Sequence, residues 1–426
     1  MKKFYPIFNS SSKIYLNSAG GTQVPVQVIS SLNYYIKELY IQPHGDSLTS
    51  MVSSQYLKKA KDITNIILNN KNGHLIFGSS TSQLAYNFAN SIKNTYLKDG
   101  NIILPTFSHE SCISPFERVC NNIKWWNATY TYEKIFIDYE NLLNQVDNKT
   151  KLIILPHVSN ILGNIVDIKY LTSEIKKINK NTKILVDGVA GLPHLCVDVN
   201  DYNIDGYFFS YYKFCGLRIS CLYLKSDINP YIENQNHYMI NNCMEDKLQI
   251  GGINYELLAS INGIENYFID VANTLNINSN VFNRRLYEKI MYHWSNYEKT
   301  MITALNSHLN NSKEIVKLEC EISEKVPIFS FYFKNYSTRY VNLILNELGF
   351  LTSYGKMYAD RFFTINNLDD IIRISLIHYN TLSELDKLIE ILREFKIQNS
   401  NFRYNIIFNN ILSKNLKNSF NYLSID

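Results

Sequence analysis

The chain has 426 residues, of which 46% are hydrophobic and 19% are charged, a balance typical of a globular protein and not of a disordered one. The length exceeds what a single hydrophobic core usually supports, so we expect two packed domains. The net charge of +4 is small for this size and gives no indication of a nucleic-acid or membrane surface.

The seven cysteines are scattered and form no CxxC pair, so the sequence predicts neither a zinc site nor a redox motif. Their odd number favours a reducing compartment. Lys2 and Lys3 stand near the N-terminus, but no apolar signal segment follows them. No apolar run approaches the roughly 20 residues that a membrane-spanning helix needs. We therefore expect a cytoplasmic protein without a metal site.

Six short apolar runs alternate with longer helical patterns between about residues 55 and 225. The runs cover residues 74–77, 101–104, 151–155, 183–186, 206–209 and 220–224. Stretches such as 82–98 and 171–180 between them have the spacing of amphipathic helices. This alternation predicts an α/β fold with a parallel sheet and helices on both faces. The near-continuous apolarity of the runs indicates strands that are buried on both sides.

A smaller layer is expected from residues 1–50 and from the chain after residue 275, where helical patterns cover 280–308 and 383–395. Residues 328–333 alternate like a strand of a smaller sheet. We therefore predict a large domain over residues 51–274, a small C-terminal domain over 275–398 and an N-terminal segment, 1–50, that joins the small domain. The Asn-rich tail, 399–426, is given no role.

An aspartate and a lysine follow two of the predicted strands. Asp187 closes the run 183–186, and Lys213 comes four residues after the run 206–209. In an open parallel sheet, ligands bind just beyond the carboxyl ends of the strands. A buried lysine there can form a Schiff base with an aldehyde, and an aspartate can neutralise a pyridinium nitrogen. Those are the two groups that pyridoxal phosphate requires from a protein.

Two more polar residues follow predicted strands: His109 after 101–104 and Asn160 after 151–155. Each residue alone has an ordinary explanation, since a strand-end aspartate is usually a turn residue and a lone histidine is usually structural. Four suitable residue types at the carboxyl ends of one sheet favour a common site.

A phosphate site is indicated by Ser80 and Thr81, which follow the first strand and precede the helical run 83–98. A helix N-terminus offers unpaired N–H groups to an anion, and hydroxyls add donors. The same residues would also serve as a plain helix cap. Neither GxGxxG nor GxxxxGK[ST] is present, which excludes the common dinucleotide and P-loop motifs.

Several longer motifs resemble one family. These are YLNSAGGTQVP at 15–25, SHESCISPF at 108–116, HVSNILG at 157–163, SYYKFCG at 210–216 and RISLIHYNT at 373–381. Together they resemble the class V aminotransferase superfamily of pyridoxal-phosphate enzymes, in its cysteine-desulfurase-like branch. The resemblance implies the fold-type-I PLP-dependent transferase fold, with a large domain of mainly parallel sheet and a smaller α/β C-terminal domain. It also implies a homodimer.

The resemblance implies a role for each matching residue. Lys213 would carry the cofactor as a Schiff base, Asp187 would face its ring nitrogen, and His109 would stack on the ring. Asn160 would contact the phenolate oxygen. The phosphate ligands would come from Ser80, Thr81, Ser210 and Tyr212. Arg373 would hold the carboxylate of an amino-acid substrate, and Asn17 lies in the segment that resembles the family's substrate pocket.

The sequence also departs from the desulfurase pattern. Ala190 stands where a glutamine is usual, Tyr212 replaces a histidine, Leu217 replaces a proline, and Gly252 replaces a threonine. No cysteine occurs between Cys320 and Arg373, although desulfurases carry a sulfur-accepting cysteine in this region. The matching loop, 352–358, reads TSYGKMY.

From these features we predict an enzyme that acts on a small L-amino acid. The favoured reaction is β-elimination, or C–S lysis, of a cysteine-like substrate without a protein persulfide. Transamination or epimerisation of another amino acid remains open. So does a PLP-binding protein without turnover, to which the substitutions at Ala190, Leu217 and Gly252 would correspond.

Overall fold

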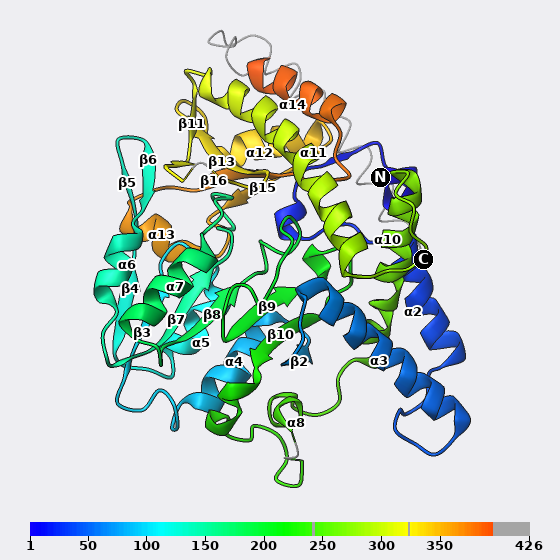
Figure 1. Cartoon of the computed structure of the whole chain (residues 1–426). Coiled ribbons are helices and arrows are strands. Elements are labelled where there is room, and N and C mark those ends of the chain that lie inside the picture. The colour runs from blue at the N-terminus through cyan, green and yellow to red at the C-terminus, as the bar shows by residue number, and fades with distance from the viewer. Residues whose placement is uncertain (241–242, 323, 395–426) are drawn as a thin grey trace, which may run out of the picture.

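The structure, a computed structural model, describes residues 1–240, 243–322 and 324–394. Its central sheet has seven strands: β2 (Gly73–Gly78), β3 (Asn101–Pro105), β4 (Ile123–Trp126), β7 (Thr150–Pro156), β8 (Lys183–Asp187), β9 (Gly206–Ser210) and β10 (Ser220–Lys225). They lie in the order β2-β10-β9-β8-β7-β3-β4 (Figure 1). Only β10 runs antiparallel to its neighbours; the other pairs are parallel. The predicted α/β fold with a mainly parallel sheet is confirmed.

All six predicted apolar runs are strands of this sheet, whereas the edge strand β4 was not predicted. Ile123, Lys124 and Trp125 of β4 are only partly buried. An edge strand with a lysine in the middle lacks the continuous apolarity that marks the central strands, and this explains the omission.

Strand β8 shows why the sequences of the central strands are continuously apolar. Ile184 and Val186 belong to a core shared with α7 (Ile168–Ile178) and α10 (Asn262–Thr274). Leu185, between them, belongs to a second core shared with α4 (Thr81–Ile92). Successive side chains of a strand point to opposite faces, so both faces are covered by helices.

Helix α4 ends earlier than the sequence pattern predicts. The pattern continues to residue 98, but the helix ends at Ile92. The amides of Tyr96 and Leu97 both donate to the carbonyl oxygen of Ile92, at 3.0 Å each, in a non-helical turn. Tyr96 and Leu97 are nevertheless buried, so the apolar spacing that extends the prediction reflects packing after the helix.

A second, antiparallel sheet contains β11 (Ile315–Lys317), β13 (Ile328–Phe333), β15 (Ser353–Gly355) and β16 (Ile371–Ser375). The order is β11-β13-β16-β15. Three helices share a core with it: α11 (Arg284–Asn310), α12 (Thr338–Glu347) and α14 (Leu382–Glu394). Figure 1 shows this layer, in yellow and orange, at one end of the central sheet.

The N-terminal residues contact both layers. Strand β1 (Ile14–Tyr15) pairs in parallel with β14 (Phe350–Leu351) beside the small sheet. Helix α2 (Val26–Glu38) instead packs on α10, where a Cβ at Gly263 would lie 2.3 Å from the Gln27 carbonyl oxygen. The four-part division of the chain stays a prediction, and the tail 399–426 lies outside the described residues.

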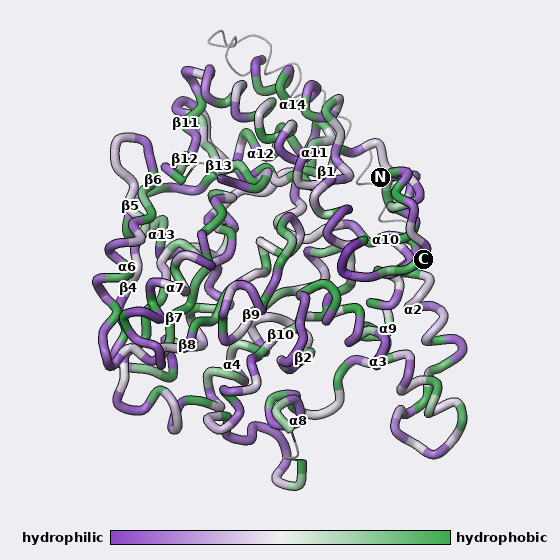
Figure 2. The backbone as a smooth tube through the Cα atoms, viewed as in Figure 1, coloured by the Kyte–Doolittle hydropathy of each residue, from purple (hydrophilic) through white to green (hydrophobic). Residues whose placement is uncertain are grey.

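The remaining elements complete the two layers. The helices are α1 (Ile7–Ser10), α3 (Leu48–Leu68), α5 (Ser114–Glu117), α6 (Tyr139–Gln145), α8 (Met244–Leu248), α9 (Tyr255–Ser260) and α13 (Asp360–Ile365). A three-stranded sheet contains β5 (Ala128–Thr131), β6 (Lys134–Ile137) and β12 (Glu319–Cys320). Hydropathy alternates along the outer helices α2 and α3 (Figure 2). Within the described ranges, no helix combines the length and apolarity needed to cross a bilayer.

Candidate active site

Lys213 lies at the end of η4 (Tyr211–Lys213), a single 3-10 turn directly after β9. The turn is anchored on both sides: Tyr211 Oη lies 2.7 Å from Thr64 Oγ1, and the amide of Cys215 donates to Thr22 Oγ1 at 3.0 Å. The Lys213 side chain is buried, with 5% of its surface exposed. Burial, together with the positive charge of Arg373, lowers the pKa of Lys213 to about 8.

A lysine with this pKa should react as an amine far below the pH at which ordinary lysines do. In the cofactor-free protein, we expect the rate of Lys213 modification by trinitrobenzenesulfonate to rise with pH and to level off near the pKa of about 8. The exposed Lys169 provides the control: its hydrogen bond to Asp201 raises its pKa, so its rate should still be rising where that of Lys213 levels off. Peptide mapping at each pH measures both rates. Equal midpoints for the two lysines would contradict the environment described here.

Asp187 ends β8 and lies 6% exposed at the carboxyl edge of the sheet. Its Oδ1 accepts a hydrogen bond from the Val189 amide at 3.1 Å, and its carboxylate also accepts from Ser108 and Cys112. Burial raises the pKa of Asp187, although these donors and the charge of Lys213 oppose the shift. Within the described ranges, no basic side chain forms an ion pair with Asp187. A cationic group of a ligand could therefore pair with this buried carboxylate.

His109 caps the short helix η3 (Glu110–Cys112) and forms part of the same pocket. Its Nδ1 accepts a hydrogen bond from the Ser111 amide at 3.0 Å, which leaves Nε2 to carry the proton. Burial, with the charges of Lys213 and Arg373, lowers the pKa of His109 to about 3. The ring is therefore neutral at physiological pH, as a flat stacking surface beside a pyridinium should be.

Hydroxyl groups gather where β2 and β9 end. Ser80 Oγ accepts from the Gln83 amide at 3.1 Å and caps α4, so the plain capping role is present. Thr81 Oγ1 lies 2.8 Å from Ser210 Oγ, which in turn lies 2.6 Å from Ser220 Oγ. The N-terminus of α4 and the hydroxyls of Ser80, Thr81 and Ser210 therefore face one pocket and can donate to an anion.

Arg373 lies on β16 and reaches the central sheet from the smaller one. Its Nη1 donates to the Asn160 carbonyl oxygen at 3.0 Å and its Nη2 to Asn17 Oδ1 at 3.1 Å. Asn160 Nδ2 donates to the Met357 carbonyl oxygen at 2.8 Å. Among the described residues, Arg373 Nε and Asn160 Oδ1 are buried without a hydrogen-bond partner.

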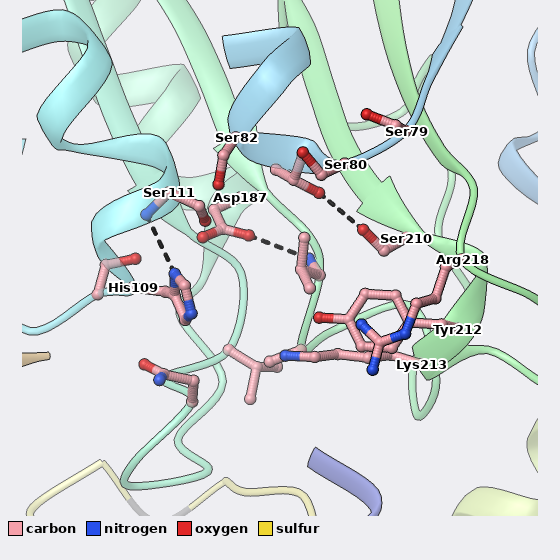
Figure 3. Close-up of a pocket in the computed structure, with 16 residues that line it drawn as sticks. Ser79, Ser80, Ser82, His109, Ser111, Asp187, Ser210, Tyr212, Lys213 and Arg218 are labelled. Atoms are coloured by element: carbon pink, nitrogen blue, oxygen red, sulfur yellow. Dashed lines mark hydrogen bonds between the residues drawn. The ribbon is translucent and has the colours of Figure 1, made fainter. Parts of the chain in front are cut away.

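Eight of the ten predicted site residues line one pocket: Ser80, Thr81, His109, Asn160, Asp187, Ser210, Tyr212 and Lys213. Figure 3 shows Lys213 and Tyr212 on one side of this pocket and His109 on the other. The two remaining residues, Arg373 and Asn17, do not line it; they adjoin it through the bonds to Asn160 and to each other. The individual roles of the ten residues stay predictions.

Several residues of the pocket were not predicted as site residues, among them Ser108 and Ser111, and two more bring a charge or a ring to the site: Arg218 and Tyr358. Arg218 lines the pocket, and its Cζ lies 4.8 Å from the centre of the Tyr212 ring. The Tyr358 ring lies 5.0 Å from that of His109, at an angle of 32°. In the sequence, Arg218 is marked only by its place directly after Leu217, which replaces the family's proline. The position of Tyr358 depends on tertiary contacts that no sequence pattern reveals.

The loop 352–358 and the turn after it are fastened to the large sheet. The Glu110 amide donates to the Tyr358 carbonyl oxygen at 3.0 Å, and Asn160 holds Met357 as described. Arg361, in the following helix, binds Glu110 through Nε at 2.7 Å and Glu117 through Nη1 at 3.0 Å. We call these contacts the clamp. They hold the segment that lacks a cysteine against the His109 side of the pocket.

The unsatisfied groups suit pyridoxal phosphate. The buried carboxylate of Asp187 could pair with a pyridinium nitrogen. Ser80, Thr81 and the α4 N-terminus can take a phosphate. Lys213 supplies an amine that is about half neutral near pH 8. Fold and pocket together define the class of fold-type-I pyridoxal-phosphate enzymes.

Comparisons with known proteins identify the family. The family described as aminotransferase class-V matches residues 14–252 and 277–388. The aminotransferase-like protein FGM3 of Gibberella zeae is 29% identical over 394 residues, covering 88% of this chain and 93% of the relative. The cysteine desulfurase-like protein ustD of Aspergillus flavus is 25% identical, covering 91% of this chain and 90% of the relative.

Solved structures agree on the fold. The cysteine desulfurase of Thermococcus onnurineus NA1 superposes with a TM-score of 0.79 at 17% identity, over 92% of this chain and 96% of that one. The cysteine desulfurase CsdA of Escherichia coli gives 0.74 at 16%, over 93% and 98%. The chain belongs to the aminotransferase class-V family, whose members are pyridoxal-phosphate enzymes, transferases or lyases.

Proposed function

We propose that the protein is a pyridoxal-phosphate-dependent lyase. It cleaves the Cβ–S bond of a small, cysteine-like L-amino acid and releases the sulfur directly, without a protein persulfide. The observation that carries this proposal is the wall of the pocket. None of the described residues that line it is a cysteine, and the loop 352–358 is fixed by the clamp without offering a thiol.

Each residue has a physical task in this proposal. Lys213, with its lowered pKa, removes the proton from the substrate Cα. Arg373 fixes the α-carboxylate, and its unpaired Nε provides a free donor for it. The neutral His109 ring limits movement on the opposite side of the site. Pyridoxal phosphate supplies the electron sink for the carbanion, and Asp187 keeps its ring nitrogen protonated.

The thiols near the site are poor sulfur acceptors. Cys112 is buried against Asp187, and burial raises its pKa well above the usual value. Cys215 follows Lys213 closely, but burial raises its pKa to about 12. A thiolate, not a thiol, is the nucleophile in persulfide formation. Neither residue therefore offers a nucleophile at neutral pH.

The proposed reaction balances without an oxidant or reductant. With L-cysteine, the Cα–H and Cβ–S bonds break, and the electron pair of the Cβ–S bond leaves with sulfur as hydrogen sulfide. Water then hydrolyses the remaining enamine to pyruvate and ammonia. A desulfurase would instead leave the sulfur on a cysteine and form alanine.

The product distribution tests the reaction. The holoenzyme should convert a sulfur amino acid from a panel that includes L-cysteine and S-sulfocysteine into pyruvate, ammonia and free sulfide or thiosulfate. Intact-mass analysis should show no sulfur bound to the protein, because the acceptor thiolate is missing. A Cys215→Ser variant should give the same products. Alanine together with a protein persulfide would overturn the proposal. A keto acid with pyridoxamine phosphate, or racemised substrate, would establish the transaminase or epimerase alternative instead.

Assembly and location complete the proposal. We propose a homodimer, the assembly typical of the family. It is supported by apolar side chains exposed along α2, α3 and the segment between them: Tyr34, Ile36, Tyr40, Ile41, Leu48, Met51 and Val52. Exposed apolar residues gathered in one region mark interaction surfaces.

A cytoplasmic location is proposed because all seven cysteines are free thiols in the structure.

A further inference from the structure

Arg218 places a second guanidinium group at the active site. It stands between β9 and β10, five residues after Lys213, and is exposed to solvent. Its Cζ lies 4.8 Å from the centre of the Tyr212 ring, while Lys213 Nζ lies 5.8 Å from the same ring. Figure 3 shows the guanidinium across Tyr212, directed toward the Lys213 side of the pocket.

In the part of the chain that the structure describes, no ion pair neutralises the charge of Arg218. Among the described residues, no carboxylate forms an ion pair with Arg218, and the contact that its guanidinium makes is with an aromatic ring. Asp187 is the only carboxylate that the described residues contribute to the pocket wall, and it ends a different strand. A fixed cation at a pocket without an acidic partner favours an anionic ligand.

The position of Arg218 relates it to the substrate side of the site. The Tyr212 ring packs on Gly21, where a Cβ would lie only 3.2 Å from Tyr212 Cδ2. Tyr15 Oη donates a hydrogen bond to the Gly21 carbonyl oxygen at 2.7 Å, and Asn17 of the same segment accepts one from Arg373, so the Tyr212 ring packs on the segment that also contacts Arg373. Figure 3 shows Ser80 and Ser82 apart from the guanidinium, while Arg218 and Ser79 together line a second cavity beside the start of α4.

We infer that the substrate is an α-amino acid whose short side chain ends in a second anionic group, a carboxylate or a sulfur oxyanion, and that Arg218 binds this group. Arg373 then serves the α-carboxylate. This inference rests on the proposed function and narrows its substrate class. S-Sulfocysteine fits both: water and the substrate give pyruvate, ammonium and thiosulfate, with the Cβ–S electron pair leaving on thiosulfate.

Binding of two unreactive ligands to the holoenzyme tests the inference. L-2-Methylaspartate and 2-aminoisobutyrate both lack a Cα proton and differ by one carboxylate. The wild type should bind L-2-methylaspartate more tightly in calorimetry. Arg218→Gln should weaken that binding about 10- to 100-fold, the effect of losing one charge-assisted hydrogen bond. Binding of 2-aminoisobutyrate should stay unchanged, and Arg218→Lys should recover part of the affinity.

Arg118→Gln is the matched control. Arg118 is likewise an exposed arginine over a tyrosine ring, with Cζ 5.8 Å from the Tyr86 ring centre, but it does not line the pocket. This variant should bind both ligands as the wild type does. Thermal unfolding of each variant confirms that the protein is folded.

Three results would overturn the inference. The first is an equal loss of affinity for both ligands in Arg218→Gln, and the second is no loss for either. The third is faster release of pyridoxal phosphate with unchanged ligand preference, which would assign Arg218 to the cofactor phosphate. Because the ligands are unreactive, these outcomes are independent of turnover. Failure of the proposed function would appear separately, as an absence of pyruvate with every sulfur amino acid in the panel.

Discussion

Replacing Lys213 with alanine is expected to remove the covalent link to the cofactor and to lower turnover by about 10⁴-fold, the upper end of what a positioned acid–base group contributes. Lys213 is the buried amine at the pocket, and its pKa of about 8 gives it a reactive neutral form. Borohydride reduction of the wild-type holoenzyme should leave a stable adduct on the peptide that contains Lys213. The variant should show none, yet it should still bind the cofactor through contacts of the phosphate with Ser80 and Thr81.

Lys325 provides the control for this experiment. Its pKa is also lowered, to about 7, chiefly by burial, but it does not line the pocket. Lys325→Met should therefore keep both the adduct on Lys213 and normal turnover. An adduct on a different lysine in the wild type would remove Lys213 from the proposed mechanism.

Asp187→Asn is expected to lower kcat by about 10- to 100-fold and to speed release of the cofactor. The change keeps the size of the side chain and removes its charge. A charge-assisted hydrogen bond contributes about 1.5–3 kcal/mol, and each 1.36 kcal/mol corresponds to about tenfold in rate. Without the carboxylate, the ring nitrogen loses its proton more easily and the ring becomes a weaker electron sink. Stopped-flow kinetics and cofactor dissociation measure the two effects.

A matched aspartate separates this effect from a general loss of structure. Asp167 caps α7 by accepting a hydrogen bond from the Tyr170 amide at 2.9 Å. Asparagine caps a helix about as well as aspartate, so Asp167→Asn should leave kcat unchanged. Near-normal turnover of Asp187→Asn would show that another residue faces the ring nitrogen.

The sequence predicts the central sheet well because its strands are buried on both faces. Ile184, Leu185 and Val186 alternate between two cores, so the whole run is apolar and bounded by polar residues. Parallel strands end at one edge of the sheet, and this rule alone predicts that Asp187 and Lys213 lie close together; both line the same pocket. The edge strand β4 escapes prediction because it is partly exposed.

The contacts made by residues outside the sheet could not be predicted in this way. Arg373 and Asn17 are 356 positions apart and meet through a hydrogen bond that depends on how the two layers dock. Tyr358 reaches His109 only because the clamp fixes the turn after β15. Arg218 is a candidate ligand-binding residue because of its tertiary surroundings, in which its guanidinium has no acidic partner among the described residues.

The clamp also bears on how sulfur chemistry could evolve in this scaffold. A relay enzyme needs a nucleophile on an arm that swings from the substrate to an outside acceptor. Here the corresponding stretch is held at Met357, Tyr358 and Arg361, so it is anchored beside the site. A Tyr354→Cys substitution would supply the nucleophile, but the anchored segment could not carry its thiol from the substrate to an outside acceptor. Gaining a sulfur-delivery role would therefore require loss of the contacts at Met357, Tyr358 and Arg361 as well as one substitution to cysteine. Several mutations thus separate direct release of sulfur from its transfer through a protein cysteine.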